Sequence, residues 1–230
     1  MDLGLAIDRR APVRRIPLGD GTSWVDLVEG FVPDAGALFA EVLAHGRWAQ
    51  NEVLRYDRYV PEQRLSAGLP KSGPPLAVRQ ADLHLESAYR VRFDGVAAIH
   101  YRNGADFQGL HSDRTMKWLD DTLIAIVVLG VRRPFVLRER GISANHADPT
   151  PAGHAPDDVV LMPGEGDLLV MGGRNQRDWL HGVPASDTDQ GRISLTWRWT
   201  SRRGQPDTNP TYYDGRQFSD RARQPPNRRR

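Results

Sequence analysis

The stretch DTLIAIVVLGV, residues 121–131, is apolar at nearly every position. A strand with one solvated face alternates apolar and polar residues, whereas a strand buried on both faces is apolar throughout. The stretch is also shorter than the roughly 20 apolar residues that a membrane-spanning helix needs. It therefore predicts a central strand in a sheet that is covered on both sides.

Further strands are predicted on both sides of this stretch. The segment DDVVLMPGEGDLLVMGG, residues 157–173, predicts two strands that are joined as a hairpin at PGEG. The remaining predicted strands cover residues 23–32, 96–101, 133–140, 178–184 and 191–200. Their short spacing is typical of an all-β core.

Two helices and two long loops complete the prediction. Residues 33–48 predict a helix that ends near Gly46, and residues 81–93 predict a second helix. Residues 51–75 predict a surface loop or lid, and residues 141–156 a polar loop. Because strands and helices do not alternate, we expect a mainly β jelly-roll or sandwich core with flanking helices.

The composition limits the chemistry that the chain can perform. Its 230 residues suit one large domain, and the absence of cysteine excludes disulfides and thiolate metal sites. Any metal must therefore be held by His, Asp or Glu. The first 15 residues lack the apolar core of a signal peptide, so we expect a cytoplasmic protein. A net charge of +2 says little about partners, and we attribute the excess of Arg over Lys to codon bias.

One candidate metal site is visible in the sequence. His111 and Asp113 stand two residues apart on a predicted extended segment, where side chains two apart share a face. His181 follows 70 residues later, on a strand that a jelly roll can bring alongside. Two His and one carboxylate form the facial triad of non-heme Fe(II) enzymes. A Zn-dependent hydrolase could use the same ligands.

Two arginines follow the second histidine. Arg192 and Arg198 share one face of the predicted strand 191–200. If that face points inward, both guanidinium groups need an anionic partner, such as a dicarboxylate bound beside the metal. The alternative is an outward, solvated Arg face with the core on the other side. Hydrophobicity alone favours this alternative, because positions 193, 195, 197 and 199 are apolar.

At this point the chain resembles the AlkB family of Fe(II)- and 2-oxoglutarate-dependent dioxygenases. The resemblance runs from about Trp48 to Trp199 and rests on the order and spacing of five motifs: YVPEQRLSAGL, YRNGADFQGLHSD, GDLLVMGG, LHGVP and RISLTWR. It implies a double-stranded β-helix, which is one form of jelly roll. It also implies Fe(II) as the metal, 2-oxoglutarate as the cosubstrate and O2 as the oxidant.

The resemblance assigns a role to each residue of the candidate site. His111, Asp113 and His181 match the iron ligands. Arg192 matches the residue that pairs with the distal carboxylate of 2-oxoglutarate, and Tyr101 matches a tyrosine that hydrogen-bonds the same molecule. The second arginine of the family, near the metal-binding end of the cosubstrate, corresponds to Arg198.

Three positions depart from the family pattern. Ile99 stands where members of the family usually carry Asn, and Ser194 stands where they often do. Of the two side chains, only that of Ser194 can still donate a hydrogen bond. Thr115 replaces an acidic residue that contacts the base. The resemblance therefore implies a largely retained cosubstrate site and an altered substrate site.

The implied activity is oxidative demethylation of alkylated bases in DNA or RNA, with release of formaldehyde, succinate and CO2. The base would have to be single-stranded or flipped out of a duplex. One alternative keeps the chemistry but acts on a small molecule or a protein side chain. Another keeps the fold as a binding module without turnover. Candidate substrate residues are Trp48, Tyr56, Tyr59, Arg114 and Thr115.

We expect three regions along a monomeric chain. Residues 1–22 are an N-terminal extension, and residues 23–200 form the dioxygenase domain. Residues 201–230 form a basic, flexible tail that ends in RARQPPNRRR.

Overall fold

The apolar stretch forms β8 (Thr122–Gly130), which lies inside a seven-stranded sheet and is buried along almost its whole length. The computed structural model describes residues 6–55, 58–69, 73–113, 116–141 and 156–208. β8 pairs antiparallel with β11 (Leu168–Gly173) on one side and with β13 (Arg192–Thr200) on the other. The prediction of a central buried strand is confirmed.

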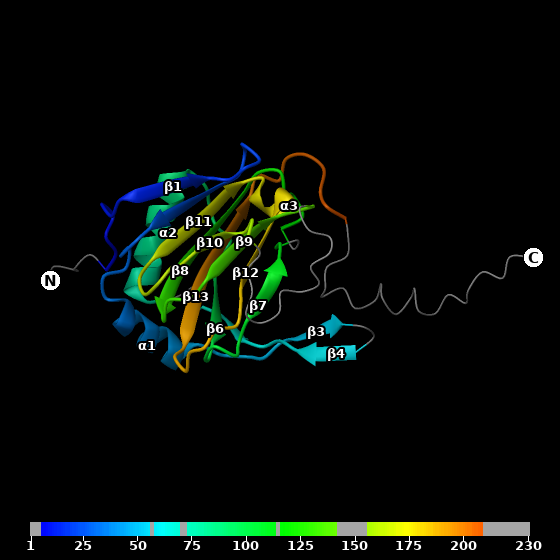
Figure 1. The fold of residues 1–230 in the computed structure, drawn as a ribbon. Helices are drawn as coiled ribbons and strands as arrows, with labels where there is room; N and C mark the ends of the chain where they lie inside the picture. The colour runs from blue at the N-terminus through cyan, green and yellow to red at the C-terminus, as the bar shows by residue number, and fades with distance from the viewer. Residues whose placement is uncertain (1–5, 56–57, 70–72, 114–115, 142–155, 209–230) are drawn as a thin grey trace, which may run out of the picture.

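Two sheets face each other (Figure 1). The large sheet has the order β1-β2-β11-β8-β13-β6-β5, with the additional strands β1 (Val13–Pro17), β2 (Trp24–Val28), β6 (Val96–Tyr101) and β5 (Leu65–Gly68). The small sheet has the order β10-β9-β12-β7, formed by β10 (Val159–Leu161), β9 (Phe135–Glu139), β12 (Trp179–Val183) and β7 (Gln108–His111). Together they make the expected jelly roll.

Two helices cover the outer face of the large sheet (Figure 1). α1 (Ala35–His45) begins after Asp34, whose Oδ1 accepts a hydrogen bond from the amide of Ala37 at 3.3 Å. α2 (Leu76–Tyr89) begins after Pro75 and ends at Arg90, which has a left-handed backbone with φ of 55°. The predicted range 81–93 was therefore wrong at both ends. A short helix, α3 (Asn175–Asp178), precedes β12.

The large sheet separates two apolar cores. The outer core lies between the sheet and the helices, and contains Leu38 and Val42 of α1 together with Ile193, Leu195 and Trp197 of β13. The inner core lies between the two sheets and contains Tyr101, Val128, Phe135, Leu137 and Trp179, among others. Both faces of β13 are therefore buried.

This arrangement agrees with the inward arginine face that the resemblance to the AlkB family implies and overturns the solvated face that hydrophobicity favoured. Hydrophobicity favoured a solvated face, but Arg192 is 0% exposed, and Ser194 and Thr196 are also buried. The apolar residues of β13 do face a core, as the pattern indicated, but it is the outer one. The polar residues face the space between the sheets, which the sequence pattern alone does not reveal.

Two further predictions were wrong. The segment 157–173 is not a hairpin, because β10 pairs with β9 in the small sheet while β11 pairs with β2 and β8 in the large one. The turn at PGEG instead carries the chain from one sheet to the other. Residues 51–75 are not only a loop: β3 (Glu52–Arg55) and β4 (Arg58–Pro61) form a hairpin, and β5 pairs with β6.

Several expectations concern parts of the chain that the structure does not describe. The polar loop 141–156 lies almost wholly outside the described residues, as does the tail from residue 209 onward. Within residues 1–22, β1 pairs with β2 and so extends the large sheet. Among the described residues, no helix combines the length and apolar character that crossing a membrane requires.

Candidate active site

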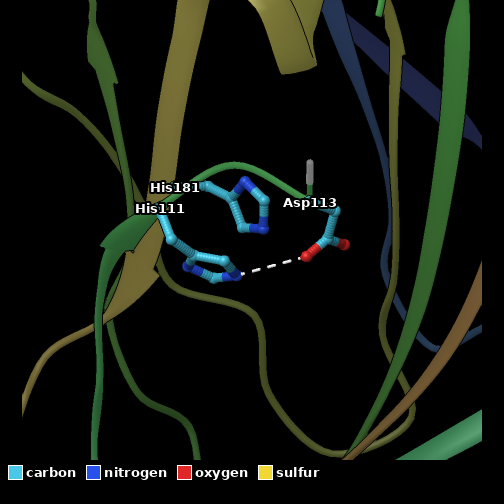
Figure 2. Close-up of side chains that lie close together, drawn as sticks. All are labelled: His111, Asp113 and His181. Atoms are coloured by element: carbon cyan, nitrogen blue, oxygen red, sulfur yellow. Dashed lines mark ion pairs between the residues drawn. The ribbon is translucent and has the colours of Figure 1, made fainter. Parts of the chain in front are cut away.

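Two histidines meet across a strand pair of the small sheet. His111 ends β7 and His181 lies in β12, and the two are direct partners in the antiparallel register. Asp113 follows two residues after His111 and points to the same space (Figure 2). One potential ligand atom from each of the three residues lies within 4.8 Å of the others. The triad predicted from the sequence is therefore assembled by the fold.

Asp113 is held from three sides. Its Oδ2 accepts a hydrogen bond from Nε of Arg198 at 2.6 Å, and its Oδ1 lies 3.5 Å from Nε2 of His111. Its backbone amide donates to Oε1 of Gln176 at 2.8 Å. Burial would raise the pKa of Asp113, but the charge of Arg198 holds that pKa well below its usual value. The carboxylate is therefore ionised, as a metal ligand must be.

The two histidines present free ring nitrogens. Nδ1 of His111 lies 3.0 Å from the carbonyl oxygen of Gly109, which can only accept, so Nδ1 donates there and Nε2 is the ring nitrogen that faces Asp113. The ring of His181 stacks on Phe135 with a centroid distance of 5.8 Å. Its Nδ1 is buried without a hydrogen-bond partner among the described residues. Burial, reinforced by His111, lowers the pKa of His181 to about 3, so the ring is neutral.

These properties fit a divalent iron ion. Two imidazoles and one carboxylate on neighbouring elements match the facial triad of non-heme Fe(II) sites, and Nδ1 of His181 has no hydrogen-bond partner among the described residues. The hydrogen bond from His111 to Gly109 orients the first ring, as partners of metal-bound histidines commonly do.

A buried cationic site lies deeper between the sheets. Arg192 pairs with Tyr101 in the register of β13 and β6, and both are buried. Nη1 of Arg192 donates to the carbonyl oxygens of Arg133 and Pro163, at 3.4 and 3.3 Å. Its Nε and Nη2 have no partner in the described part of the chain. Two unpaired donors on one guanidinium fit the bidentate binding of a carboxylate, which is the role that the resemblance to the AlkB family predicts for Arg192.

Burial and the nearby charge of Arg133 lower the pKa of Arg192, to about 10, and the Tyr101 hydroxyl opposes this shift. Arg192 therefore remains charged at neutral pH and favours an anion. Ser194 is buried two positions further along β13 and pairs with Ile99, which packs against the inner core. The side chain of Ile99 contributes only apolar surface there.

The candidate substrate residues separate in space. Trp48 packs against the outer core, where its ring lies 5.3 Å from that of His100, and its indole donates to the carbonyl of Leu43. It is not brought together with the triad. Tyr59 is 63% exposed on the β3–β4 hairpin. The remaining candidates, Tyr56, Arg114 and Thr115, lie outside the described residues.

Sequence reasoning missed two buried residues beside the site. Gln176 is 0% exposed in α3 and accepts from the amide of Asp113. Arg133 is 1% exposed and lies next to Tyr101. Neither stands in a motif whose spacing indicates a role, and Arg133 shares its residue type with the half-exposed Arg132.

A groove of about 1050 Å³ opens beside the triad. It begins at Arg198 and Thr196 of β13 and runs past α2 and the start of β6. Its lining combines aromatic rings with charged groups, which include Phe93, Trp118, Trp199, Arg79, Lys117 and Asp82. None of the three candidate ligands lines the groove; Arg198, which lines it, hydrogen-bonds Asp113.

Comparison with known proteins gives a consistent result. The family model described as the 2OG-Fe(II) oxygenase superfamily matches residues 47–198. DNA oxidative demethylase ALKBH2 of Arabidopsis thaliana is 28% identical, over 82% of this chain and 70% of that protein. Alpha-ketoglutarate-dependent dioxygenase alkB homolog 3 of Bos taurus is 26% identical over 77% of this chain. The match covers 66% of that protein, just under two thirds of its length.

The solved structures support the same fold. A prolyl hydroxylase from Trichoplax adhaerens, in complex with a hypoxia inducible factor peptide fragment, superposes with a TM-score of 0.54 at 11% identity. The match covers 76% of this chain and 83% of that one. The facial triad, the buried Arg192 and the matched family model agree: the chain belongs to the 2OG-Fe(II) oxygenase superfamily, and its curated relatives there are AlkB homologues.

Proposed function

We propose that this dioxygenase oxidatively demethylates alkylated bases in DNA or RNA. The observation that carries the proposal is the groove that opens at Arg198, because this arginine hydrogen-bonds the metal ligand Asp113 and also lines a surface that carries aromatic and basic side chains. Aromatic rings stack on bases and basic side chains pair with phosphates. The similarity to a DNA oxidative demethylase over most of the chain supports the same substrate class.

The residues of the chain divide the work as follows. His111, Asp113 and His181 would hold the iron, and Arg198 keeps the carboxylate of Asp113 ionised and oriented. Arg192 and Tyr101 would bind the distal carboxylate of 2-oxoglutarate. Iron with this cosubstrate and O2 supplies the oxidising chemistry that removes an N-methyl group as formaldehyde, with release of succinate and CO2. Apolar residues of the inner core border the site.

The direct test supplies a single-stranded oligonucleotide that carries one N-methylated base, together with Fe(II), 2-oxoglutarate and air. We expect formaldehyde to form in step with succinate. The unmethylated oligonucleotide and the His111→Ala variant, which lacks one ligand, serve as controls and should give no formaldehyde.

Two other results would replace this proposal. Succinate that is released in step with a metabolite or a methylated peptide, and never with an oligonucleotide, would assign a small-molecule or protein substrate. Metal binding without any consumption of 2-oxoglutarate would indicate a binding module on the same fold.

A further inference from the structure

Arg133 is a second fully buried arginine next to Tyr101. It lies in the turn between β8 and β9, and its side chain is among the largest that are completely enclosed. Its Cζ lies 5.3 Å from the centroid of the Tyr101 ring, over the ring face. Its carbonyl oxygen accepts from Nη1 of Arg192 at 3.4 Å. Arg133 therefore contacts Tyr101 through its side chain and Arg192 through its backbone carbonyl.

The guanidinium of Arg133 ties two loops together. Nη1 donates to the carbonyl of Asn103 at 3.0 Å, and Nη2 donates to the carbonyls of Asp106 and Pro184 at 2.8 and 2.7 Å. The first two residues follow β6, which ends at Tyr101, and Pro184 follows β12, which carries the third metal ligand. Arg133 thus fixes the cosubstrate strand relative to the metal strand.

Arg133 also adds positive charge to a buried site. Among the described residues, neither Arg133 nor Arg192 donates a hydrogen bond to a carboxylate. The nearby carboxylate of Asp106 is engaged by Arg102. Burial lowers the pKa of Arg133 from that of a free arginine, and Tyr101 and Asp106 oppose the shift. Buried cations without a hydrogen-bonded carboxylate are costly, and an anion bound at the free Nε and Nη2 of Arg192 reduces that cost.

We propose that Arg133 is a positioning residue of the cosubstrate site and makes this site selective for a 2-oxo acid with a second carboxylate. Its side-chain hydrogen bonds hold the two loops together, and its guanidinium covers the Tyr101 ring. Its charge adds to the attraction that Arg192 exerts on the distal carboxylate. The inference rests on the proposed use of 2-oxoglutarate at this site.

The test is a calorimetric titration of the Mn(II)-loaded protein without oxygen. The probes are 2-oxoglutarate and 2-oxobutanoate, which lacks the distal carboxylate. We expect Arg133→Met to raise the Kd for 2-oxoglutarate about tenfold or more, the range found when a residue that orients ligand groups is removed. The Kd for 2-oxobutanoate should rise much less. Arg132→Met, which removes the half-exposed neighbour, should behave like the parent protein.

A second variant separates charge from geometry. Arg133→Lys keeps the charge but cannot bridge both loops, so it should bind both acids more weakly and keep the parental ratio of their Kd values. The affinity for Mn(II) reports whether each variant has folded. A folded Arg133→Met with parental affinity for 2-oxoglutarate, or with the same loss for both acids, would overturn the inference. If the parent itself bound no 2-oxoglutarate, the proposed function would fall first, and the inference with it.

Discussion

Nε of Arg198 lies 2.6 Å from Oδ2 of Asp113, while the other oxygen of that carboxylate lies 3.5 Å from Nε2 of His111. The Arg198 side chain also forms the start of the groove that leads to the surface. One arginine therefore connects a metal ligand with the proposed path of the substrate.

Replacing Arg198 by Met should weaken metal binding. Without the guanidinium, the pKa of Asp113 rises and its carboxylate loses its orientation, which by analogy with other ligand partners costs about 10- to 100-fold in metal affinity. Titration of the metal-free protein with Mn(II) measures the effect. Arg202→Met is the matched control, because Arg202 pairs with the exposed Asp94 in the same groove. Equal Mn(II) affinity in both variants would contradict the role given to Arg198.

Replacing Gln176 by Leu should destabilise the loop of Asp113. The amide of Asp113 would lose its acceptor, and a buried unpaired donor costs about 1–3 kcal/mol. Urea unfolding of the metal-free protein measures the loss, and Mn(II) titration should show weaker binding at the same time. The exposed Gln190 offers a control, since Gln190→Leu should change neither quantity. If Gln176→Leu unfolded at the same urea concentration as the parent protein, the hydrogen bond between Asp113 and Gln176 would not contribute to stability.

The metal-free protein should lose stability as the pH falls below about 6.5. Burial lowers the pKa of His181 to about 3, so the folded chain binds this proton more weakly than the unfolded chain does. The stabilising contribution of the neutral ring is thus complete above the unfolded pKa and is lost progressively between about 6.5 and 3. Urea unfolding at pH 7.5, 6.5 and 5.5, roughly the start of that window, measures how steeply the free energy of unfolding changes with pH. His181→Gln should flatten it; an unchanged slope would show that His181 titrates normally.

Two candidate substrate residues should respond in opposite ways. Trp48 packs on the outer core, so Trp48→Ala should lower the free energy of unfolding by about 1–3 kcal/mol and leave the affinity for a single-stranded oligonucleotide unchanged. Tyr59 is exposed, so Tyr59→Ala should leave stability unchanged. If Tyr59 stacks on a base, its loss weakens binding by about 1–3 kcal/mol. Fluorescence anisotropy measures the oligonucleotide affinity of both variants, and urea unfolding measures their stability. Weaker binding by Trp48→Ala together with lower stability of Tyr59→Ala would contradict both assignments.

The sequence predicted the triad because local geometry and topology are both simple there. The spacing of two residues in an extended segment predicted a shared side for His111, the last residue of β7, and Asp113 just beyond the strand, and antiparallel pairing brings His181 opposite His111. The apolar run of β8 identified the centre of the large sheet for a similar reason. The His111–Asp113 pair is visible because the two residues are close in the sequence. The β8 strand is visible because it is buried on both faces and therefore apolar throughout.

The orientation of β13 could not be predicted in this way. Amphipathic patterns distinguish a core from solvent, but Arg192 faces a second interior, the space between the sheets, and not solvent. Arg133 and Arg132 are adjacent and identical in type, and only the tertiary contacts with Tyr101 and Pro184 set Arg133 apart. The crossing at PGEG was missed because a hairpin turn and a turn between sheets use the same residues.

The most direct test of the whole account is a crystal structure of the protein with Mn(II) and 2-oxoglutarate, grown without oxygen. We expect the metal on His111, Asp113 and His181, and the distal carboxylate on the free Nε and Nη2 of Arg192, beside Tyr101. A metal bound elsewhere, or a 2-oxoglutarate whose distal carboxylate avoids Arg192, would contradict the account.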